Sequence, residues 1–213
     1  MGYPVILHLR GRRAVVVGGG KVAARKIRGL LEAGADVVMV APEAEPELQA
    51  LAAAGTIVWR IKTFAPSDLE GAFLVIAATN DDKVNEAVAQ AAAPGQLLNV
   101  VDAPQRCDFH VPAVIRRGPL TIAVSTEGAS PAVARRIRRE LEDQYGEEYG
   151  PYLEFLQQAR DIVLREVADP EGRKRLFQAL AADSFRQSGR WGEEFSHLLA
   201  KEKERSSKKG RER

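Results

Sequence analysis

Short apolar runs alternate with amphipathic segments over the first 125 residues, and this alternation restricts the fold more than any other feature of the sequence. The apolar runs are rich in Val and Ile and lie at residues 13–18, 36–42, 56–61, 72–79 and 97–101. Amphipathic segments suited to helices lie between them, at residues 21–33, 46–54 and 81–92. Strands with little polar alternation, separated by helices, are typical of a parallel sheet covered on both faces. We therefore predict an α/β fold built on a doubly wound parallel sheet.

The first predicted strand runs directly into the motif GGGKVA, residues 18–23, which fits the pattern G-x-G-x-x-A. An isolated glycine triplet is often a plain turn, but a strand before it and a helix after it are typical of a Rossmann-type dinucleotide site. There Gly18 allows the tight turn, Gly20 lets the pyrophosphate approach the backbone, and Ala23 lets helix and strand pack closely. The N–H groups of the first helical turn would bind the phosphates. The predicted cofactor-binding residues of this motif are Gly18, Gly20, Lys21, Val22 and Ala23.

Two later strand ends supply further candidate contacts to a dinucleotide. The second strand ends at Pro42 and Glu43, and an acidic residue near this position binds the ribose hydroxyls in dinucleotide sites. Glu43 follows a proline, however, and fits equally well as a solvated glutamate at a helix start. Residues 40–43 contain no arginine to pair with a 2′-phosphate, which favours NAD over NADP. Thr79 and Asn80 lie where the fourth strand ends and are expected to line the nicotinamide side.

After the fifth predicted strand, the chain becomes mainly helical. Residues 117–141 predict a strand, a glycine-containing loop and a helix with Ser130 as N-cap and Pro131 at its first position. Residues 152–167 and 173–185 predict two amphipathic helices. The segment ADPEGR, with its proline and glycine, predicts the break between these two helices.

Composition excludes several classes of protein. The chain has no apolar run of about 18 residues and no signal-peptide pattern, so we expect a cytoplasmic protein without a membrane span. Its single cysteine, Cys107, excludes an internal disulfide and a thiol cluster for zinc, so we expect a packed free thiol and no resident metal. Residues 201–213 hold seven basic and three acidic side chains and no apolar one, which predicts a disordered tail. No recognition motif for nucleic acid accompanies it.

Residues 99–142, NVVDAPQRCDFHVPAVIRRGPLTIAVSTEGASPAVARRIRRELE, carry a family resemblance together with VVVGGGKVAARKIRGLLEAGA and AATND. These ordered motifs resemble the dehydrogenase–ferrochelatase part of siroheme synthases, also known as precorrin-2 dehydrogenases. The resemblance implies NAD-dependent oxidation of precorrin-2 to sirohydrochlorin, on the route to siroheme or cobalamin. It also implies that Asp102, in the sequence NVVDAP, is the catalytic residue. Without the resemblance, Asp102 fits a strand-end aspartate that caps the next turn.

The same resemblance implies a domain plan. Residues 1–112 would form the NAD-binding domain, residues 113–145 a dimerisation and active-site segment, and residues 146–200 a helical domain over the substrate cleft. The chain would act as a homodimer and as the stand-alone form, without the methyltransferase domain of fused members.

Precorrin-2 is rich in carboxylates, so the resemblance also suggests arginine contacts to it. The expected substrate residues are Ser125, Thr126, Arg135 and Arg138, although arginine runs are more often a solvated helix face. A serine that is regulatory in some relatives is replaced here by Thr126, so no phosphorylation control of that kind is expected.

Two rival functions stay open. Some relatives also insert a metal, so a bifunctional dehydrogenase and ferrochelatase is one alternative, with Fe²⁺ or Co²⁺ as a substrate. His110 and Cys107 are then candidate helpers, although His110 fits equally a loop imidazole paired to the backbone. A dinucleotide-sensing regulator is the second alternative, since it would share the glycine motif without any need for Asp102.

Overall fold

The computed structural model describes residues 2–211, without the side chains of residues 206 and 208–211. Within this range the chain forms two compact units, which divide between Val111 and Pro112. Residues 113–145 and 146–200, predicted as separate segments, therefore lie in one unit. No helix of the described chain is long and apolar enough to cross a membrane.

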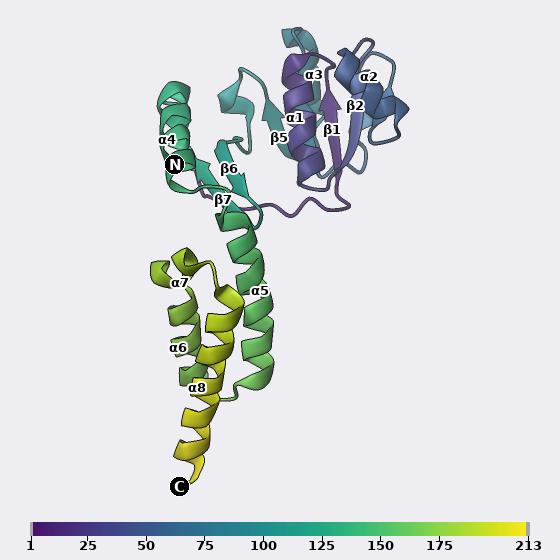
Figure 1. The fold of residues 1–213 in the computed structure, drawn as a ribbon. Helices are drawn as coiled ribbons and strands as arrows, with labels where there is room; N and C mark the ends of the chain where they lie inside the picture. Colours follow the sequence, from purple (N-terminus) through teal and green to yellow (C-terminus); the bar gives the residue numbers. More distant parts are fainter. Residues whose placement is uncertain (1, 212–213) are drawn as a thin grey trace. The chain divides into compact units, whose positions relative to one another are not determined.

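The first unit contains five parallel strands, which confirms the predicted doubly wound sheet. They are β1 (Arg13–Val17), β2 (Asp36–Val40), β3 (Val58–Arg60), β4 (Leu74–Ala77) and β5 (Leu97–Val100). Their order across the sheet is β3-β2-β1-β4-β5 (Figure 1). The direction of winding reverses between β1 and β4, and ligands of such sheets bind beyond the carboxyl ends of the strands at this reversal.

The register of the pairs aligns the carboxyl ends of four strands. Val17, the last residue of β1, pairs with Val40 of β2 and with Ala77 of β4. Ala77 pairs in turn with Val100, the last residue of β5. The segments that follow these strands therefore all leave the sheet at one edge.

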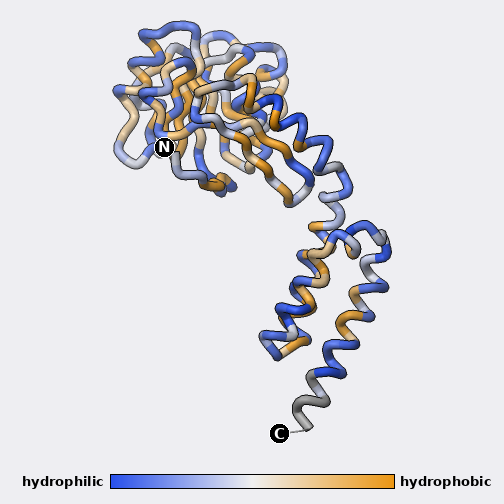
Figure 2. The backbone as a smooth tube through the Cα atoms, turned by 90° about the vertical axis from the view of Figure 1, so that its left-hand side faces the viewer, coloured by the Kyte–Doolittle hydropathy of each residue, from blue (hydrophilic) through white to orange (hydrophobic). Residues whose placement is uncertain are grey.

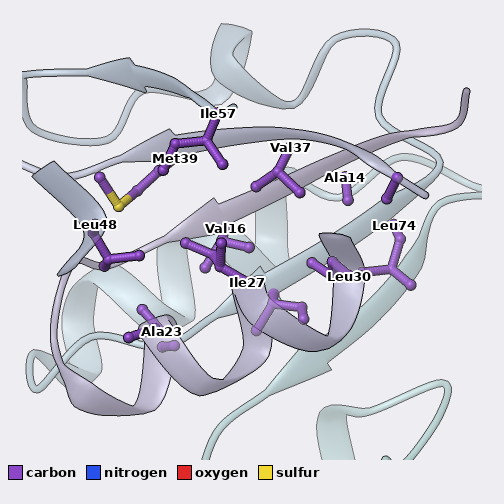
Figure 3. Packing of buried hydrophobic residues seen from close by; sticks show 14 of the residues in the cluster. Ala14, Val16, Ala23, Ile27, Leu30, Val37, Met39, Leu48, Ile57 and Leu74 are labelled. Atoms are coloured by element: carbon purple, nitrogen blue, oxygen red, sulfur yellow. The ribbon is translucent and has the colours of Figure 1, made fainter. Parts of the chain in front are cut away.

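Helices cover both faces of this sheet. They are α1 (Lys21–Glu32), α2 (Pro46–Ala53) and α3 (Asp82–Ala91), with short 3-10 turns at Pro66–Leu69 and Pro104–Arg106. Successive residues of a strand point to opposite faces, so Val16 packs with Ile27 of α1 while Val15 packs with Val88 of α3. Figure 3 shows the α1 side of this core, where Ile27 and Leu48 approach the strands. Each such side chain contributes about 1.5–3 kcal/mol through burial.

The second unit begins with an antiparallel hairpin of β6 (Ala113–Arg117) and β7 (Leu120–Val124). The sequence predicts only one strand here. It misses β6 because the apolar part of this strand, residues 113–115, is only three residues long and follows a proline. α4 (Pro131–Gln144) follows, and the predicted cap is confirmed, since the Ser130 hydroxyl accepts a hydrogen bond from the Val133 N–H (3.3 Å).

Four further helices complete the second unit: α5 (Tyr149–Glu166), α6 (Pro170–Leu180), α7 (Asp183–Ser188) and α8 (Trp191–Arg211). Their apolar residues recur along the helices and form a separate core, which includes Val163, Leu176 and Phe195. Figure 2 shows this as alternating orange and blue along each helix, in contrast to the orange strands of the first unit.

The predicted break at Pro170 and Gly172 is wrong by a few residues. Pro170 is the first residue of α6, where the missing N–H of proline costs no hydrogen bond. Asp169 caps the helix instead, because its carboxylate accepts the Gly172 N–H at 3.0 Å. The predicted helix 173–185 is also interrupted, since α6 ends at Leu180 and α7 begins at Asp183.

The prediction of a disordered tail over residues 201–213 is wrong for the part that the structure describes. α8 continues to Arg211, whereas residues 212 and 213 lie outside the described range. Charge alone suggests a solvated tail, but a helix that begins in packed residues can extend into a polar segment at little cost. Glu202, inside the predicted tail, is 7% exposed.

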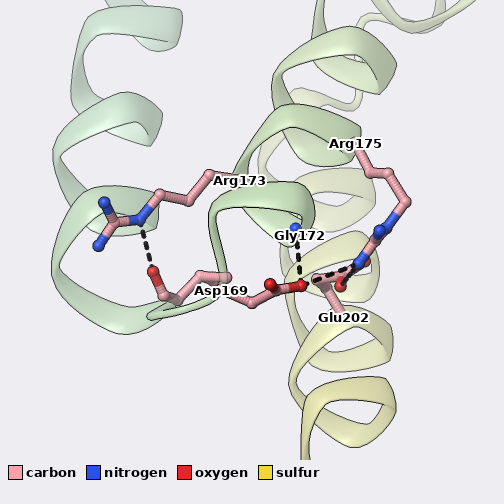
Figure 4. A network of polar contacts seen from close by, with 6 residues as sticks. Asp169, Gly172, Arg173, Arg175 and Glu202 are labelled. Atoms are coloured by element: carbon pink, nitrogen blue, oxygen red, sulfur yellow. Dashed lines mark hydrogen bonds and ion pairs between the residues drawn. The ribbon is translucent and has the colours of Figure 1, made fainter. Parts of the chain in front are cut away.

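Glu202 is held by a network of polar contacts between α6 and α8 (Figure 4). The Arg175 guanidinium donates to both oxygens of Glu202, with an Nε–Oε2 distance of 3.2 Å, and also lies 3.4 Å from Asp169 Oδ2. Gly172 lets α8 come this close, because a Cβ at this position would lie 2.8 Å from Glu202 Oε1. The hydrogen bond from Arg175 holds the pKa of the Glu202 carboxyl below its usual range.

We expect Glu202→Gln to lower the Tm of the chain by a few degrees at neutral pH, because the ion pair with Arg175 is lost. A carboxylate whose pKa is lowered by folding adds stability above its unfolded value, about 4.3, and loses it as the pH falls through the folded value. The Tm difference between wild type and Glu202→Gln should therefore shrink on acidification, as measured by calorimetry. Glu204→Gln, an exposed neighbour on α8, is the matched control. A pH-independent difference would contradict this account.

Candidate active site

The glycine motif occupies the turn from β1 to α1, and two of its glycines are required by close backbone contacts. Gly18 has φ +123°, and a Cβ there would lie 2.3 Å from the carbonyl oxygen of Ala78, beyond β4. A Cβ on Gly19 would lie 2.1 Å from the carbonyl oxygen of Glu43, beyond β2. The turn is therefore packed between the two segments that follow the neighbouring strands.

Gly20 differs from these two glycines, because a Cβ on it would meet no atom within 4 Å. It is the N-cap of α1, and no side chain caps this helix or places an acidic group in its first turn. An uncapped helix N-terminus with open space above it fits a phosphate group, which would accept the N–H groups there. Lys21 beside it is exposed and Val22 half-buried, whereas Ala23 is fully buried between helix and sheet.

Glu43 lies beside the glycine turn, as the closeness of its carbonyl oxygen to Gly19 shows, and the exposed Pro42 precedes it in the chain. The Glu45 N–H donates to the Gly19 carbonyl at 2.8 Å, which fixes the two segments together. The Glu43 side chain is exposed. The structure thus brings the predicted ribose-binding carboxylate to the edge of the glycine turn, and its contact with a ribose stays a prediction.

Thr79, after β4, is fixed by a residue that the sequence reasoning missed. Asn85 of α3 is buried, and its Oδ1 accepts from both the Thr79 hydroxyl (2.8 Å) and the Thr79 N–H (3.2 Å). The Asn85 amide nitrogen also donates to the Thr79 carbonyl at 3.0 Å. One feature of the sequence could have indicated this role: the asparagine lies three residues before the buried Val88 on the same helix. Asn80 is exposed next to this fixed loop.

Asp102 lies in the turn beyond β5. The Val101 N–H donates to the Ala77 carbonyl at 2.9 Å and so extends the sheet by one step before the turn. Asp102 itself is exposed and has φ +62°, a left-handed conformation that few residues other than glycine adopt, although Asp and Asn tolerate it. Its carboxylate thus belongs to the same sheet edge as the glycine turn and Thr79.

The two candidate helpers near Asp102 differ in their surroundings. Cys107 is half-buried, and its sulfur contacts the backbone on both sides of the Asp102 turn. His110 is exposed, and among the described residues no hydrogen bond involves its imidazole, so the expected pairing with the backbone is not found. Across the described residues there is no cluster of three or more His, Cys, Asp or Glu side chains that could hold a metal ion.

The predicted substrate residues lie in the second unit, around the loop from β7 to α4. Ser125 and Thr126 bind within this loop, since their hydroxyls accept from the Glu127 N–H (3.2 Å) and the Ser130 N–H (3.1 Å). Arg138 forms an ion pair with Glu142 one helical turn later, whereas Arg135 is exposed. Arg138 would have to exchange Glu142 for a carboxylate of a ligand.

Comparisons with known proteins match both parts of the chain. A family model described as putative NAD(P)-binding matches residues 5–113, and one described as sirohaem biosynthesis protein central matches residues 117–144. A precorrin-2 dehydrogenase of Priestia megaterium is 36% identical over 186 residues, which cover 87% of this chain and 92% of that protein. This chain belongs to the precorrin-2 dehydrogenase and siroheme synthase family.

Other members of the family agree with this assignment. A solved structure named SirC, precorrin-2 dehydrogenase, superposes with a TM-score of 0.83 at 34% identity and covers 94% of this chain and 100% of that chain. The siroheme synthase of Methylococcus capsulatus is 43% identical over 176 residues, which cover 82% of this chain but 37% of that protein. The chain thus spans somewhat over a third of the length of the siroheme synthases it matches. The family resemblance predicted from the sequence is confirmed.

The glycine turn yields a prediction that separates folding from binding. We expect Gly20→Ala to fold with an unchanged Tm, because its φ of −85° suits alanine and the Cβ has open space. The same Cβ would occupy the space proposed for the pyrophosphate, so NAD affinity measured by titration calorimetry should fall about tenfold or more. Gly18→Ala should instead lower the free energy of unfolding by about 2 kcal/mol or more, through backbone overlap and strain. Unaltered NAD binding by Gly20→Ala would contradict the assignment of this site.

Proposed function

We propose that the chain catalyses the NAD-dependent dehydrogenation of precorrin-2 to sirohydrochlorin. The observation that supports this most is that the glycine turn, Glu43, Thr79 and Asp102 all follow the carboxyl ends of strands in one sheet. The strand register brings these ends to the same level, because Val17, Val40, Ala77 and Val100 are paired across the sheet. A cofactor site and a carboxylate on the edge of one rigid sheet suit a reaction that removes a hydride and a proton. The family relationship supplies the substrate class.

In this proposal, separate residues bind the cofactor and accept the proton. The α1 N-terminus and Gly20 bind the pyrophosphate of the cofactor, and Glu43 binds its adenosine ribose. Thr79, oriented by Asn85, lines the nicotinamide side together with Asn80. When bound, NAD supplies the acceptor for the hydride. The Asp102 carboxylate accepts the proton that leaves with it, so the substrate loses two electrons and two hydrogens and gains one double bond.

In this proposal the cofactor is NAD rather than NADP because of the position of Glu43. Its carboxylate would accept hydrogen bonds from the ribose hydroxyls of NAD but would repel the 2′-phosphate of NADP. Residues 40–43 offer no arginine to neutralise that phosphate.

In the second unit, Ser125, Thr126, Arg135 and Arg138 are proposed to bind the tetrapyrrole carboxylates, because arginine pairs well with carboxylates. A homodimer is proposed from the family relationship and from the match of residues 117–144 to the sirohaem central model.

A second activity, insertion of Fe²⁺ or Co²⁺ as a substrate into sirohydrochlorin, is favoured by one observation. His110 presents an exposed imidazole eight positions after Asp102, where it could accept pyrrolic protons together with that carboxylate. Incubation of the purified protein with sirohydrochlorin and either metal, compared with the uncatalysed rate, tests this activity separately.

We expect Asp102→Asn to lower kcat for NADH formation from precorrin-2 by about 10²–10⁴, because the amide cannot accept the proton. Asparagine also tolerates a left-handed turn, so the Tm should not change. NADH absorbance follows the reaction, and Asp36→Asn at the opposite edge of the sheet, where β2 begins, is the matched control. Full activity of Asp102→Asn would remove this residue from the mechanism, and no NADH formation by wild type would refute the proposed function.

We expect Glu43→Gln to reduce the preference for NAD over NADP by about tenfold in kcat/KM, because the repulsion of the 2′-phosphate is removed. Steady-state kinetics with both cofactors measures the ratio. Glu70→Gln, an exposed carboxylate that precedes the amino end of β4, serves as the control. If the ratio stays at its wild-type value, Glu43 is a solvated surface residue.

A further inference from the structure

The chain beyond β5 turns back and runs along the outer edge of that strand. β5 is the last strand of the sheet, so one of its edges lacks a neighbouring strand. The Asp108 N–H donates to the Leu98 carbonyl at 2.8 Å, and the Leu98 N–H donates to Asp108 Oδ2 at 2.9 Å. The returning segment therefore satisfies backbone groups that another strand would otherwise bind.

The side chain of Asn99 binds a later part of the same returning segment. Asn99 lies in β5 and is only 6% exposed. Its amide nitrogen donates to the Phe109 carbonyl at 2.9 Å and lies 3.5 Å from the sulfur of Cys107. A buried amide that holds both strand and returning segment fixes the base of the Asp102 turn.

The Cys107 thiol closes the turn from inside. Its sulfur accepts the Val100 N–H at 3.2 Å and lies 3.3 Å from the Val100 carbonyl and 3.4 Å from the Ala103 carbonyl, to either of which the thiol can donate. Val100 and Ala103 bracket Asp102 on its two sides. One side chain therefore spans the two ends of the short segment that carries the carboxylate.

Asp102 needs such support because of its conformation. Among the described residues, only Asp102 and Glu127 combine a side chain with a positive φ. A left-handed backbone costs free energy and persists where the surrounding contacts determine it, which is common where a side chain must be aimed. Here the Ala103 N–H donates to the Val100 carbonyl at 3.3 Å across the turn, Cys107 contacts both of these residues, and Asn99 holds the segment that carries Cys107.

We propose that Asn99 and Cys107 are positioning residues that hold the Asp102 carboxylate in its productive direction without touching the substrate. This inference rests on the proposed catalytic role of Asp102. It predicts that loosening the turn lowers kcat while cofactor and substrate binding stay intact, since neither side chain belongs to the predicted binding sites.

The decisive variants are Cys107→Ala, which removes the sulfur contacts, and Cys107→Ser, which keeps a donor and an acceptor at the same position. We expect Cys107→Ala to lower kcat about tenfold with KM values for NAD and precorrin-2 within about twofold of wild type, because misdirection of a catalytic group acts on the chemical step. Cys107→Ser should recover most of the loss. Val38→Ala, in the same apolar cluster but on β2, is the control for lost packing and should lower the Tm with kcat unchanged.

A double-mutant cycle then tests whether the effect passes through Asp102. In the Asp102→Asn background, Cys107→Ala should cause no further loss of kcat, because the carboxylate to be positioned is already absent. A wild-type kcat for Cys107→Ala, or an equal loss in both backgrounds, would overturn the positioning role while leaving the proposed function in place. Full activity of Asp102→Asn would overturn the catalytic assignment and this inference with it.

Discussion

The parallel pairing of β1 with β2 and β4 is the constraint on which the rest of the first unit depends. Because Val17 is opposite both Val40 and Ala77, the three segments that follow leave the sheet at one level. The glycine turn can then pack against the backbone beyond β2 and beyond β4 at once. A slip of one residue in either pair would turn the side chains of that strand to the wrong face and break the contact of the glycine turn on that side. The glycine turn thus inherits its position from the backbone hydrogen bonds of the sheet.

Much of the first unit could be predicted from the sequence because its signals are local. Unbroken Val and Ile runs give buried parallel strands, and the position of Gly18 and Gly20 after such a run gives the turn and the helix start. Ser130 and Pro131 likewise mark the start of α4 by their local chemistry. Each of these features depends on residues within a few positions of one another, which a sequence displays directly.

The features that escaped prediction depend on partners that are distant in the chain or on partial burial. Glu202 is packed because Arg175, 27 residues earlier, lies across from it. β6 escaped because its apolar part, residues 113–115, is short and only Ile115 in it is buried. In the sequence, Asn99 is a polar residue within a predicted strand, and Cys107 is expected to be a packed thiol. Their polar atoms lie near the Asp102 turn only because the chain reverses after β5. The family resemblance could name Asp102 but not the groups around it.

The returning segment after β5 also affects how the chain behaves toward other copies of itself. An open edge strand is a template on which a second chain can add a strand, and natural sheets block such edges. Here the blocking segment is the same one that carries Asp102, with Asp108 placing a carboxylate against the Leu98 N–H. The same segment therefore protects the sheet edge and supports the proposed catalytic group, and a substitution that frees it would weaken both.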